Sequence, residues 1–246
     1  MQGGGEVQRS GNTGWRLEIP PGEAGTYRLA QLDDYSGIAR STYPWSAPVR
    51  VRLNARACSR KVPGTWGFGW WNDPFGLAVI QGGRARFPTL PNAAWFFFAS
   101  DSNYLSLRDD LPGNGQLAAA FQSPGQLPIN LVLGLPLFSL IFIPPLARRL
   151  RHWLRHFVKQ DSGTLDINPT EWHSYEIDWR LDRVSFRVDG RVIQETGIVP
   201  REPLGLVIWI DNQYASWLPD GHIGYGTLAN PETAWLQIDG LELTPA

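Results

Sequence analysis

Two short clusters contain the side chains best suited to chemistry in this chain. The first is Trp70-Trp71-Asn72-Asp73, and the second is Trp209-Ile210-Asp211-Asn212-Gln213-Tyr214. Both place Asp and Asn shortly after Trp, where a loop at a strand end presents side chains to a ligand. If the chain is an enzyme, we expect Asp73 and Asp211 to be its acid and base, although their spacing does not require proximity. Asn and Asp are also common turn residues, so each cluster alone is more typical of a turn.

A run of aromatic residues provides a second candidate. In Ala93-Ala94-Trp95-Phe96-Phe97-Phe98-Ala99, strand alternation directs Trp95 and Phe97 to one surface and Phe96 and Phe98 to the other. Rings that line a groove suit sugars, which stack their C–H faces, or apolar chains such as isoprenoids. The alternative is that all four rings belong to the core. The candidate ligand-binding residues are therefore Trp66, Trp70, Trp71, Asn72, Trp95, Phe97, Trp209, Asn212 and Tyr214.

Short alternating segments must position these residues. From Val49 to Ala57, apolar residues alternate with Arg and Asn, a pattern typical of a half-buried antiparallel strand whose Arg side faces water. Asp189-Gly190 between two such segments predicts a tight hairpin, because both central residues of the favoured turn need positive φ. With 20 prolines and frequent turn residues, the chain is expected to form one β-sandwich domain over residues 1–246.

One stretch breaks this pattern, because residues 111–160 contain no Asp or Glu. We interpret it as an insertion with an apolar segment at 127–146, interrupted by prolines, and a basic amphipathic helix at 146–159. Leu146, Leu150, Trp153, Leu154, Phe157 and Val158 are expected on one face of that helix, and Arg148, Arg149, Arg151, Arg155 and Lys159 on the other.

Three interpretations of the insertion remain open. It could cross a membrane, although its prolines argue against a continuous helix. It could pack on the sandwich, as apolar segments usually do. It could lie on an anionic membrane surface, which an apolar wedge followed by a basic helix suits best. In that case Arg148, Arg149, Arg151, Trp153 and Arg155 would form the membrane-facing surface.

Composition excludes several classes. The formal net charge of −1 provides no general attraction to nucleic acid. Cys58 is the only cysteine, so no intramolecular disulfide exists, and the four histidines show no metal-ligand spacing. We therefore expect no metal and no cofactor. The first residues lack a secretion signal, which predicts a cytoplasmic protein, peripheral to the membrane if the insertion binds one.

Several motifs resemble one family. Residues 172–179 (WHSYEIDW), residues 182–192 (DRVSFRVDGRV), residues 63–70 (PGTWGFGW) and the closing strand at 234–243 are similar to glycoside hydrolase family 16 and related lectins. The resemblance implies a concanavalin A-like antiparallel β-sandwich, a jelly roll. It also implies a concave cleft for carbohydrate.

The chain departs from that family where its catalysis occurs. The family has Glu, Asp and Glu at alternating positions on the strand after the early Trp motif, whereas the counterpart here is the aromatic run at 93–99. Retaining hydrolysis needs two carboxylates, so the family's mechanism is not carried over. Glu176 and Asp178 share a strand face but lie in a different strand, where we expect ordinary solvent-facing positions.

Three functions follow from these patterns. The first is binding of a glycan or glycoconjugate through the aromatic residues. The second is a membrane-peripheral protein that binds, or acts on, a lipophilic isoprenoid or lipid-linked molecule. The third is an enzyme that uses Asp73 and Asp211. A carbohydrate or a lipophilic small molecule is thus the expected partner, with an anionic membrane surface as a further candidate.

Overall fold

The computed structural model describes residues 1–76, 86, 88–124, 143–201 and 203–245. It confirms the predicted antiparallel β-sandwich, because all pairings between named strands in these ranges are antiparallel. The strands are β1 (Glu6–Ser10), β2 (Gly14–Ile19), β3 (Leu29–Asp33), β4 (Val49–Ala57), β5 (Thr65–Trp71), β6 (Ala93–Ala99), β7 (Gly115–Gln122), β8 (Lys159–Thr164), β9 (His173–Trp179), β10 (Val184–Val188), β11 (Arg191–Thr196), β12 (Gly205–Asp211), β13 (Gln213–Trp217), β14 (Ile223–Thr227) and β15 (Ala234–Pro245).

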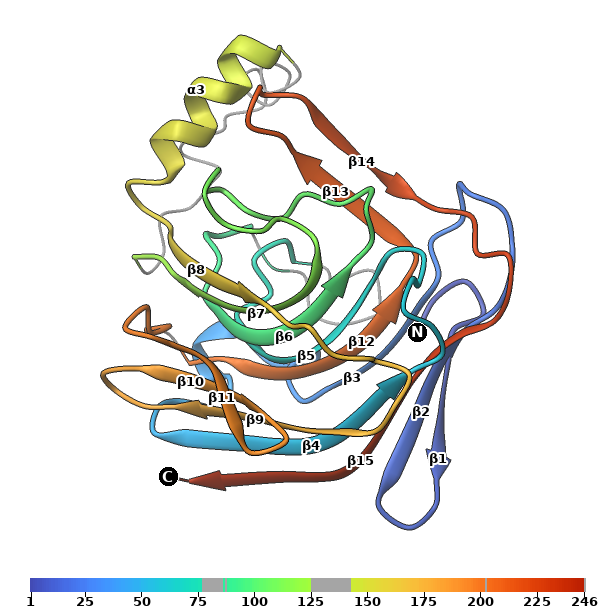
Figure 1. Ribbon diagram of the computed structural model, residues 1–246. Helices are drawn as coiled ribbons and strands as arrows, with labels where there is room; N and C mark the ends of the chain where they lie inside the picture. Colours follow the sequence, from blue (N-terminus) through green and yellow to red (C-terminus); the bar gives the residue numbers. More distant parts are fainter. Residues whose placement is uncertain (77–85, 87, 125–142, 202, 246) are drawn as a thin grey trace.

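Two large sheets form the sandwich (Figure 1). A seven-stranded sheet has the order β1-β2-β15-β4-β9-β10-β11, and a six-stranded sheet has the order β3-β12-β5-β6-β7-β8. The helix α3 (Pro144–Leu154) and the hairpin β13–β14 lie beyond the six-stranded sheet, on the side facing away from the seven-stranded one. The short 3-10 turn η1 (Arg40–Thr42) precedes β4.

Strand alternation fills the space between the sheets. In β4 the residues Val49, Val51, Leu53, Ala55 and Ala57 are all buried, as the sequence pattern predicts. Aromatic residues join the two sheets: the ring centroids of Phe68 and Tyr175 lie 5.1 Å apart, and those of Phe96 and Phe186 lie 5.3 Å apart. Burial of this apolar surface is the main favourable contribution to folding.

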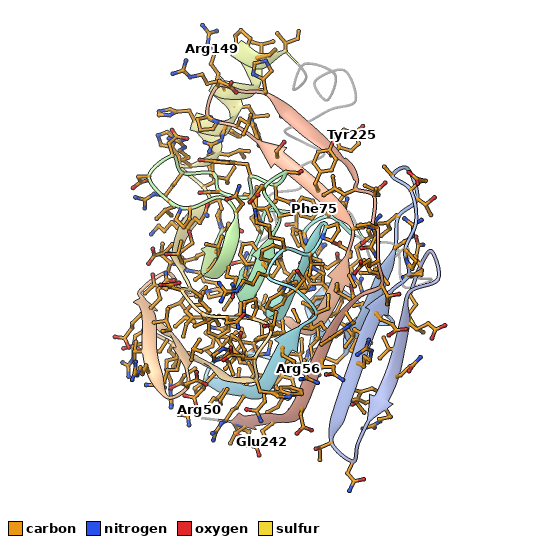
Figure 2. All side chains as sticks on the ribbon, turned by 45° about the vertical axis from the view of Figure 1, so that its right-hand side comes forward. Arg50, Arg56, Phe75, Arg149, Tyr225 and Glu242 are labelled. Carbon is orange, nitrogen blue, oxygen red and sulfur yellow. The ribbon has the colours of Figure 1, made fainter. Side chains whose placement is uncertain are left out.

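The outer face of the seven-stranded sheet is charged. The Arg187 side chain lies 2.6 Å from Glu176, and Arg180 lies 2.8 Å from Asp178. Glu176 and Asp178 are thus ion-paired strand positions on the sheet exterior. Figure 2 shows Arg50, Arg56 and Glu242 on the same outer side, far from Arg149 on α3.

The predicted hairpin at Asp189-Gly190 is confirmed. Asp189 has φ 50° and Gly190 has φ 76°, and β10 and β11 pair on either side of them. Asp189 also accepts hydrogen bonds from the Ser174 backbone amide and from the His173 ring nitrogen, at 2.9 and 2.7 Å. The turn is therefore fixed to β9 as well as to its own two strands.

The insertion begins later in the chain than the sequence suggests. Residues 115–122 form β7, which pairs with β6 and β8 inside the six-stranded sheet. The expected start at residue 111 was wrong because a strand of small residues, Ala118 to Ala120, contains no acidic side chain to mark it as part of the sheet. Most of the apolar segment at 127–146 lies outside the described residues. The described part of the chain contains no helix that could span a lipid bilayer.

The basic helix exists, but its bounds and its inward face differ from expectation. It spans Pro144–Leu154 rather than 146–159, because residues 155–157 form a turn and β8 begins at Lys159. Ala147 and Arg151 are buried, whereas Leu146 and Trp153 are exposed. The assignment of Arg151 to a membrane-facing surface was therefore wrong.

Arg151 joins three segments of the chain. Its guanidinium donates to the carbonyl oxygens of Ser106, Leu107 and Trp217, at 2.8, 2.6 and 3.0 Å, and to Asp109 Oδ1 at 2.8 Å. Arg155 also donates to the Leu107 carbonyl and pairs with Asp109. Because a buried cation needs partners for all its N–H groups, this arrangement fixes α3 to the loop at 105–110 and to the end of β13.

We predict that Arg151→Met destabilises the protein by roughly 3 kcal/mol, because it removes the side-chain donor of the Ser106 and Trp217 carbonyl oxygens and one of the two cations that pair with Asp109. The exposed Arg149→Met is the matched control, with an expected effect within about 0.5 kcal/mol. Urea unfolding of both variants measures the difference. Equal stabilities would contradict the proposed role of Arg151.

Candidate functional site

The outer face of the six-stranded sheet, on the side of α3, is aromatic. Strand alternation places Trp71 of β5, Trp95 and Phe97 of β6, Phe121 of β7 and Trp209 of β12 on this face. Phe96 and Phe98 point into the core between the sheets. The expectation that Trp95 and Phe97 share one surface is confirmed. We call these five residues the aromatic face.

Glycines beneath the rings explain how so many aromatic side chains fit on one face. Gly67 lies between Trp209 and Phe97 in the cross-strand register, and Gly69 lies between Val207 and Trp95. A Cβ at Gly67 would lie 2.6 Å from Trp209 Cη2, and one at Gly69 would lie 2.8 Å from Trp95 Cβ. Glycine at both positions therefore leaves room for the indole rings directly above the sheet.

Three indole rings form a contiguous cluster. The rings of Trp71 and Trp209 are nearly parallel, at 7° and 6.5 Å between centroids. Trp95 contacts both, at 5.7 Å from Trp71 and 5.6 Å from Trp209. Trp71 is buried, whereas Trp95 and Trp209 remain partly exposed. The exposed parts of Trp95 and Trp209 form the accessible surface of the cluster.

Polar groups line the β3 edge of the aromatic face. Gln31 pairs with Trp209 and Asp33 pairs with Val207 in the register of β3 and β12. The Gln31 side-chain amide donates to Asp33 Oδ2 at 2.9 Å and to the Tyr35 hydroxyl at 3.2 Å. Gln31 and Asp33 are partly exposed. Directional hydrogen-bonding groups therefore lie beside the indole rings.

Apolar side chains cover the opposite part of the face. Leu105, Leu107, Leu154 and Phe157 pack against the aromatic face, and the buried Val158 belongs to the same cluster. These residues come from the loop that Arg151 binds and from the end of α3. The helix thus limits how much of the aromatic face remains accessible.

Asp211 orients Trp209. The Trp209 indole N–H donates to Thr65 Oγ1 at 2.8 Å, and that hydroxyl donates to Asp211 Oδ1 at 2.8 Å. Asp211 also accepts bonds from the backbone amides of Thr65 and Gln213 and from the Tyr27 hydroxyl. Burial raises the pKa of Asp211 to about 7, against the lowering effect of these hydrogen bonds.

Asp73 is a buried structural residue. Its side chain is inaccessible and lies 3.0 Å from Arg86 Nη1, which is itself almost fully buried. The same guanidinium donates to the carbonyl oxygens of Tyr35, Ser36 and Ile38. Asp73 also has φ 47°, a left-handed conformation that Asp tolerates in turns. This arrangement joins two loops and leaves the carboxylate no access to a ligand.

The structure does not bring Asp73 and Asp211 together. Asp211 pairs with Thr65 at the start of β5, whereas Asp73 follows Trp71 at the end of that strand. Six residues of extended chain separate these ends by about 20 Å. The two carboxylates cannot act as acid and base on one bond.

Four further candidate site residues have structural roles. Trp66 and Trp70 point into the core between the sheets, so they are not ligand-binding residues. Asn72 is fully buried; its side-chain amide donates to the Leu90 carbonyl oxygen and accepts from the Asn92 backbone amide. Asn212 is fully buried and donates to the carbonyl oxygens of Thr26 and Leu228. These amides satisfy backbone groups where loops pack, which is the turn role that their residue types also predict.

Tyr214 lies in β13, outside the aromatic face. Its ring packs against Gly226 of β14, where an added Cβ would lie 3.0 Å from it. Among the candidate membrane-facing residues, Arg148, Arg149 and Trp153 are exposed on α3, whereas Arg155 pairs with Asp109. Within the described residues, no group of three potential metal ligands occurs.

Sequence reasoning missed Phe121, Gln31 and Asp33. Phe121 lies in the region interpreted as an insertion, although Leu117, Ala119 and Phe121 alternate with Ala118 and Ala120. Gln31 and Asp33 alternate with Ala30 and Leu32 in the same manner. The period of two was the available signal, but a short strand of small or polar residues provides little contrast.

Comparisons with known proteins find distant structural neighbours and no match by sequence. No protein-family model matches the chain, and no curated protein matches it. Structural neighbours include a β-glucanase, a glycoside hydrolase family 16 endo-glucanase and a legume lectin-like domain. The Bacillus licheniformis β-glucanase is 10% identical, with 98% of this chain and 82% of that chain covered and a TM-score of 0.48.

Two further structural neighbours are about as distant from this chain in sequence and structure. A legume lectin-like domain from Entamoeba histolytica is 10% identical, with 98% and 88% of the two chains covered and a TM-score of 0.47. A family 16 endo-glucanase from Bacteroides ovatus is 8% identical, with 98% and 85% covered and a TM-score of 0.47. The candidate site rests on the chain's own residues and not on these distant neighbours.

The raised pKa of Asp211 predicts a specific pH dependence of stability. Between about pH 4 and pH 7 the folded protein keeps a proton that the unfolded chain releases, so stability falls as pH rises. Asp211→Asn does not titrate. Wild type should therefore lose stability relative to Asp211→Asn as the pH rises. We expect the difference in free energy of unfolding to shift in favour of the variant by on the order of 3 kcal/mol between pH 4 and pH 7.

Urea unfolding at several pH values measures this difference. Asp109→Asn is the matched control, because its hydrogen bond from Arg155 and the nearby Arg151 charge lower the pKa of Asp109. Its curve should run parallel to that of wild type between about pH 5 and pH 7. If the stability of Asp211→Asn instead followed that of wild type at every pH, the pKa of Asp211 would not be raised in the folded protein.

Proposed function

We propose that this protein binds a carbohydrate on the aromatic face. The observation that carries the proposal is the cluster of Trp71, Trp95 and Trp209 above Gly67 and Gly69, with Gln31 and Asp33 beside it. Indole faces stack well on the C–H faces of pyranose rings, and nearby polar side chains fix the orientation of hydroxyl groups.

Binding, rather than hydrolysis, is the activity that these residues support. β6 presents Trp95 and Phe97 to this face and contains no carboxylate. Retaining hydrolysis requires two carboxyl groups about 5 Å apart. Asp211 holds the Thr65 hydroxyl that orients Trp209, which makes it a positioning residue for the binding surface.

The polar edge favours carbohydrate over a purely lipophilic ligand. An isoprenoid would be held by burial of apolar area alone and would leave Gln31 and Asp33 desolvated. A sugar can exchange hydrogen bonds with both. Binding of detergents or lipids on the aromatic face, without binding of any oligosaccharide, would reverse this assignment.

We predict that Trp209→Ala and Trp95→Ala each weaken binding at least about tenfold, which corresponds to about 1.4 kcal/mol of lost stacking and apolar contact. Calorimetric titration with a panel of gluco-, chito- and manno-oligosaccharides measures the affinity. Both side chains are partly exposed, so thermal unfolding should confirm that the variants fold.

Trp172→Ala is the matched control. Trp172 is an exposed indole that stacks on Arg56, outside the aromatic face, with 4.8 Å between the guanidinium carbon and the ring centroid. Its loss should leave the affinity unchanged. Equal losses in all three variants, or no binding to any oligosaccharide in the panel, would refute the proposed function.

A further inference from the structure

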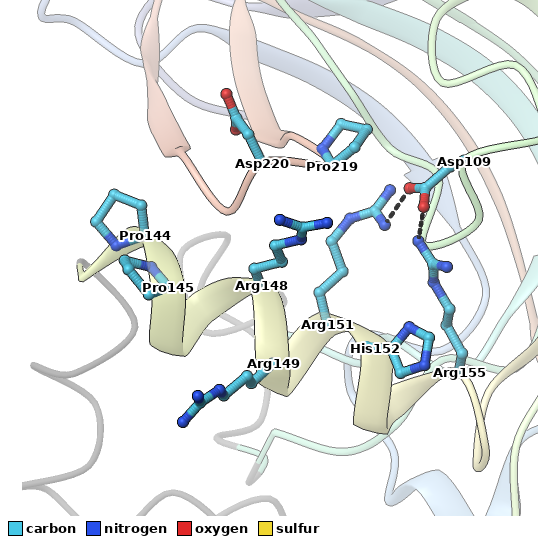
Figure 3. Close-up of a pocket in the computed structure, with 10 residues that line it drawn as sticks. All are labelled: Asp109, Pro144, Pro145, Arg148, Arg149, Arg151, His152, Arg155, Pro219 and Asp220. Atoms are coloured by element: carbon cyan, nitrogen blue, oxygen red, sulfur yellow. Dashed lines mark hydrogen bonds and ion pairs between the residues drawn. The ribbon is translucent and has the colours of Figure 1, made fainter.

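A pocket of about 790 Å³ lies between α3 and the turn that joins β13 to β14 (Figure 3). The residues Pro144, Pro145 and Arg148 form the helix side, and Pro219 and Asp220 form the turn side. The turn is close-packed against the helix at Gly221, where an added Cβ would lie 2.0 Å from the Pro144 carbonyl oxygen. The two elements therefore form one rigid pocket wall around a basic interior.

Most of the ionic groups around the pocket already have partners. Asp109 pairs with Arg151 at 2.8 Å and with Arg155 at 2.5 Å. Asp220 accepts a hydrogen bond from the His222 backbone amide at 3.0 Å, and its carboxylate lies 3.0 Å from the His222 ring. Asp109 is thus shared by two guanidinium groups, and the Asp220 carboxylate is held by the backbone and ring of His222.

Arg148 extends into the pocket without a carboxylate partner among the described residues. It forms no ion pair with any residue in the described ranges, and its guanidinium extends into the pocket beside Arg151 (Figure 3). Arg149, the next residue, also borders the pocket, but its guanidinium extends away from those of Arg148 and Arg151 in the same view. Four Arg residues and two Asp residues thus line the pocket, which gives it an excess of positive charge, and Arg148 is the cation that both extends into it and forms no ion pair in the described ranges.

We propose that this pocket binds a phosphate group carried by a larger molecule. Guanidinium groups bind phosphate through paired, charge-assisted hydrogen bonds, and the Arg148 guanidinium extends into the pocket, whereas the buried Arg151 contributes its charge from the pocket wall. The pocket volume leaves room for the rest of the ligand. This site lies on α3 and the β13–β14 turn, so it is independent of carbohydrate binding on the aromatic face.

The phosphate could come from a lipid headgroup or from a soluble phosphorylated molecule. Ile143, Leu146 and Trp153 are exposed on the same helix segment. Apolar and aromatic side chains next to cationic ones suit the boundary between lipid headgroups and acyl chains. The test therefore compares both sources.

The experiment uses Arg148→Glu and, as its matched control, Arg149→Glu. Both change the charge equally, on adjacent exposed residues of one helix. Calorimetry measures binding of inorganic phosphate and pyrophosphate. Co-sedimentation measures binding to phosphatidylcholine vesicles with and without phosphatidic acid. Thermal unfolding confirms that both variants fold.

We expect Arg148→Glu to weaken binding at least about tenfold and Arg149→Glu by less than about twofold. Trp153→Ala distinguishes the sources: loss of vesicle binding with unchanged affinity for phosphate identifies a lipid headgroup, and binding of soluble phosphate alone identifies a soluble ligand. Equal effects of the two Glu variants would show nonspecific surface attraction and overturn the proposal. Absence of binding to every probe would also overturn it.

Discussion

The structure depends on the pairing of β5 with β6, two strands that are buried on both faces. One face directs Trp66, Phe68 and Phe96 into the core between the sheets, and the other directs Trp95 and Phe97 outward. Because side chains alternate with a period of two, a shift of one residue in this pairing would exchange the two faces. The inter-sheet core and the aromatic face therefore depend on the same register.

Glycine makes this two-sided burial possible. Gly67 and Gly69 remove side chains on the outer face where Trp209 and Trp95 need space. Glycine weakens a strand through its larger loss of conformational entropy, and here packing of the indole rings offsets that cost. The same contacts hold the rings close to one another, which reduces the entropy that binding a flat ligand would cost.

The second organising contact is the buried guanidinium of Arg151. It binds carbonyl oxygens of two separate segments and the carboxylate of Asp109, so α3, the loop at 105–110 and β13 form one layer over part of the aromatic face. A hydrophobic residue at this position could contribute apolar area but could not satisfy those carbonyl groups. The charged helix is thereby joined to the sandwich, while Arg148 and Trp153 remain on its exterior.

Four features could be predicted from the amino-acid pattern: the β-sandwich, the alternation of β4, the Asp189-Gly190 turn and the separation of Trp95 and Phe97 from Phe96 and Phe98. Each depends on local rules, namely period-two alternation and the φ angles that a turn allows. In contrast, the three-dimensional arrangement of the strands was needed to show that Trp66 and Trp70 belong to the core and that Asp73 and Asp211 lie at opposite ends of β5. Likewise, it alone placed Arg151 inside. Burial and proximity result from which strands become neighbours, and residues distant in the chain, such as Asp109 and Trp217, provide the partners that make a buried charge stable.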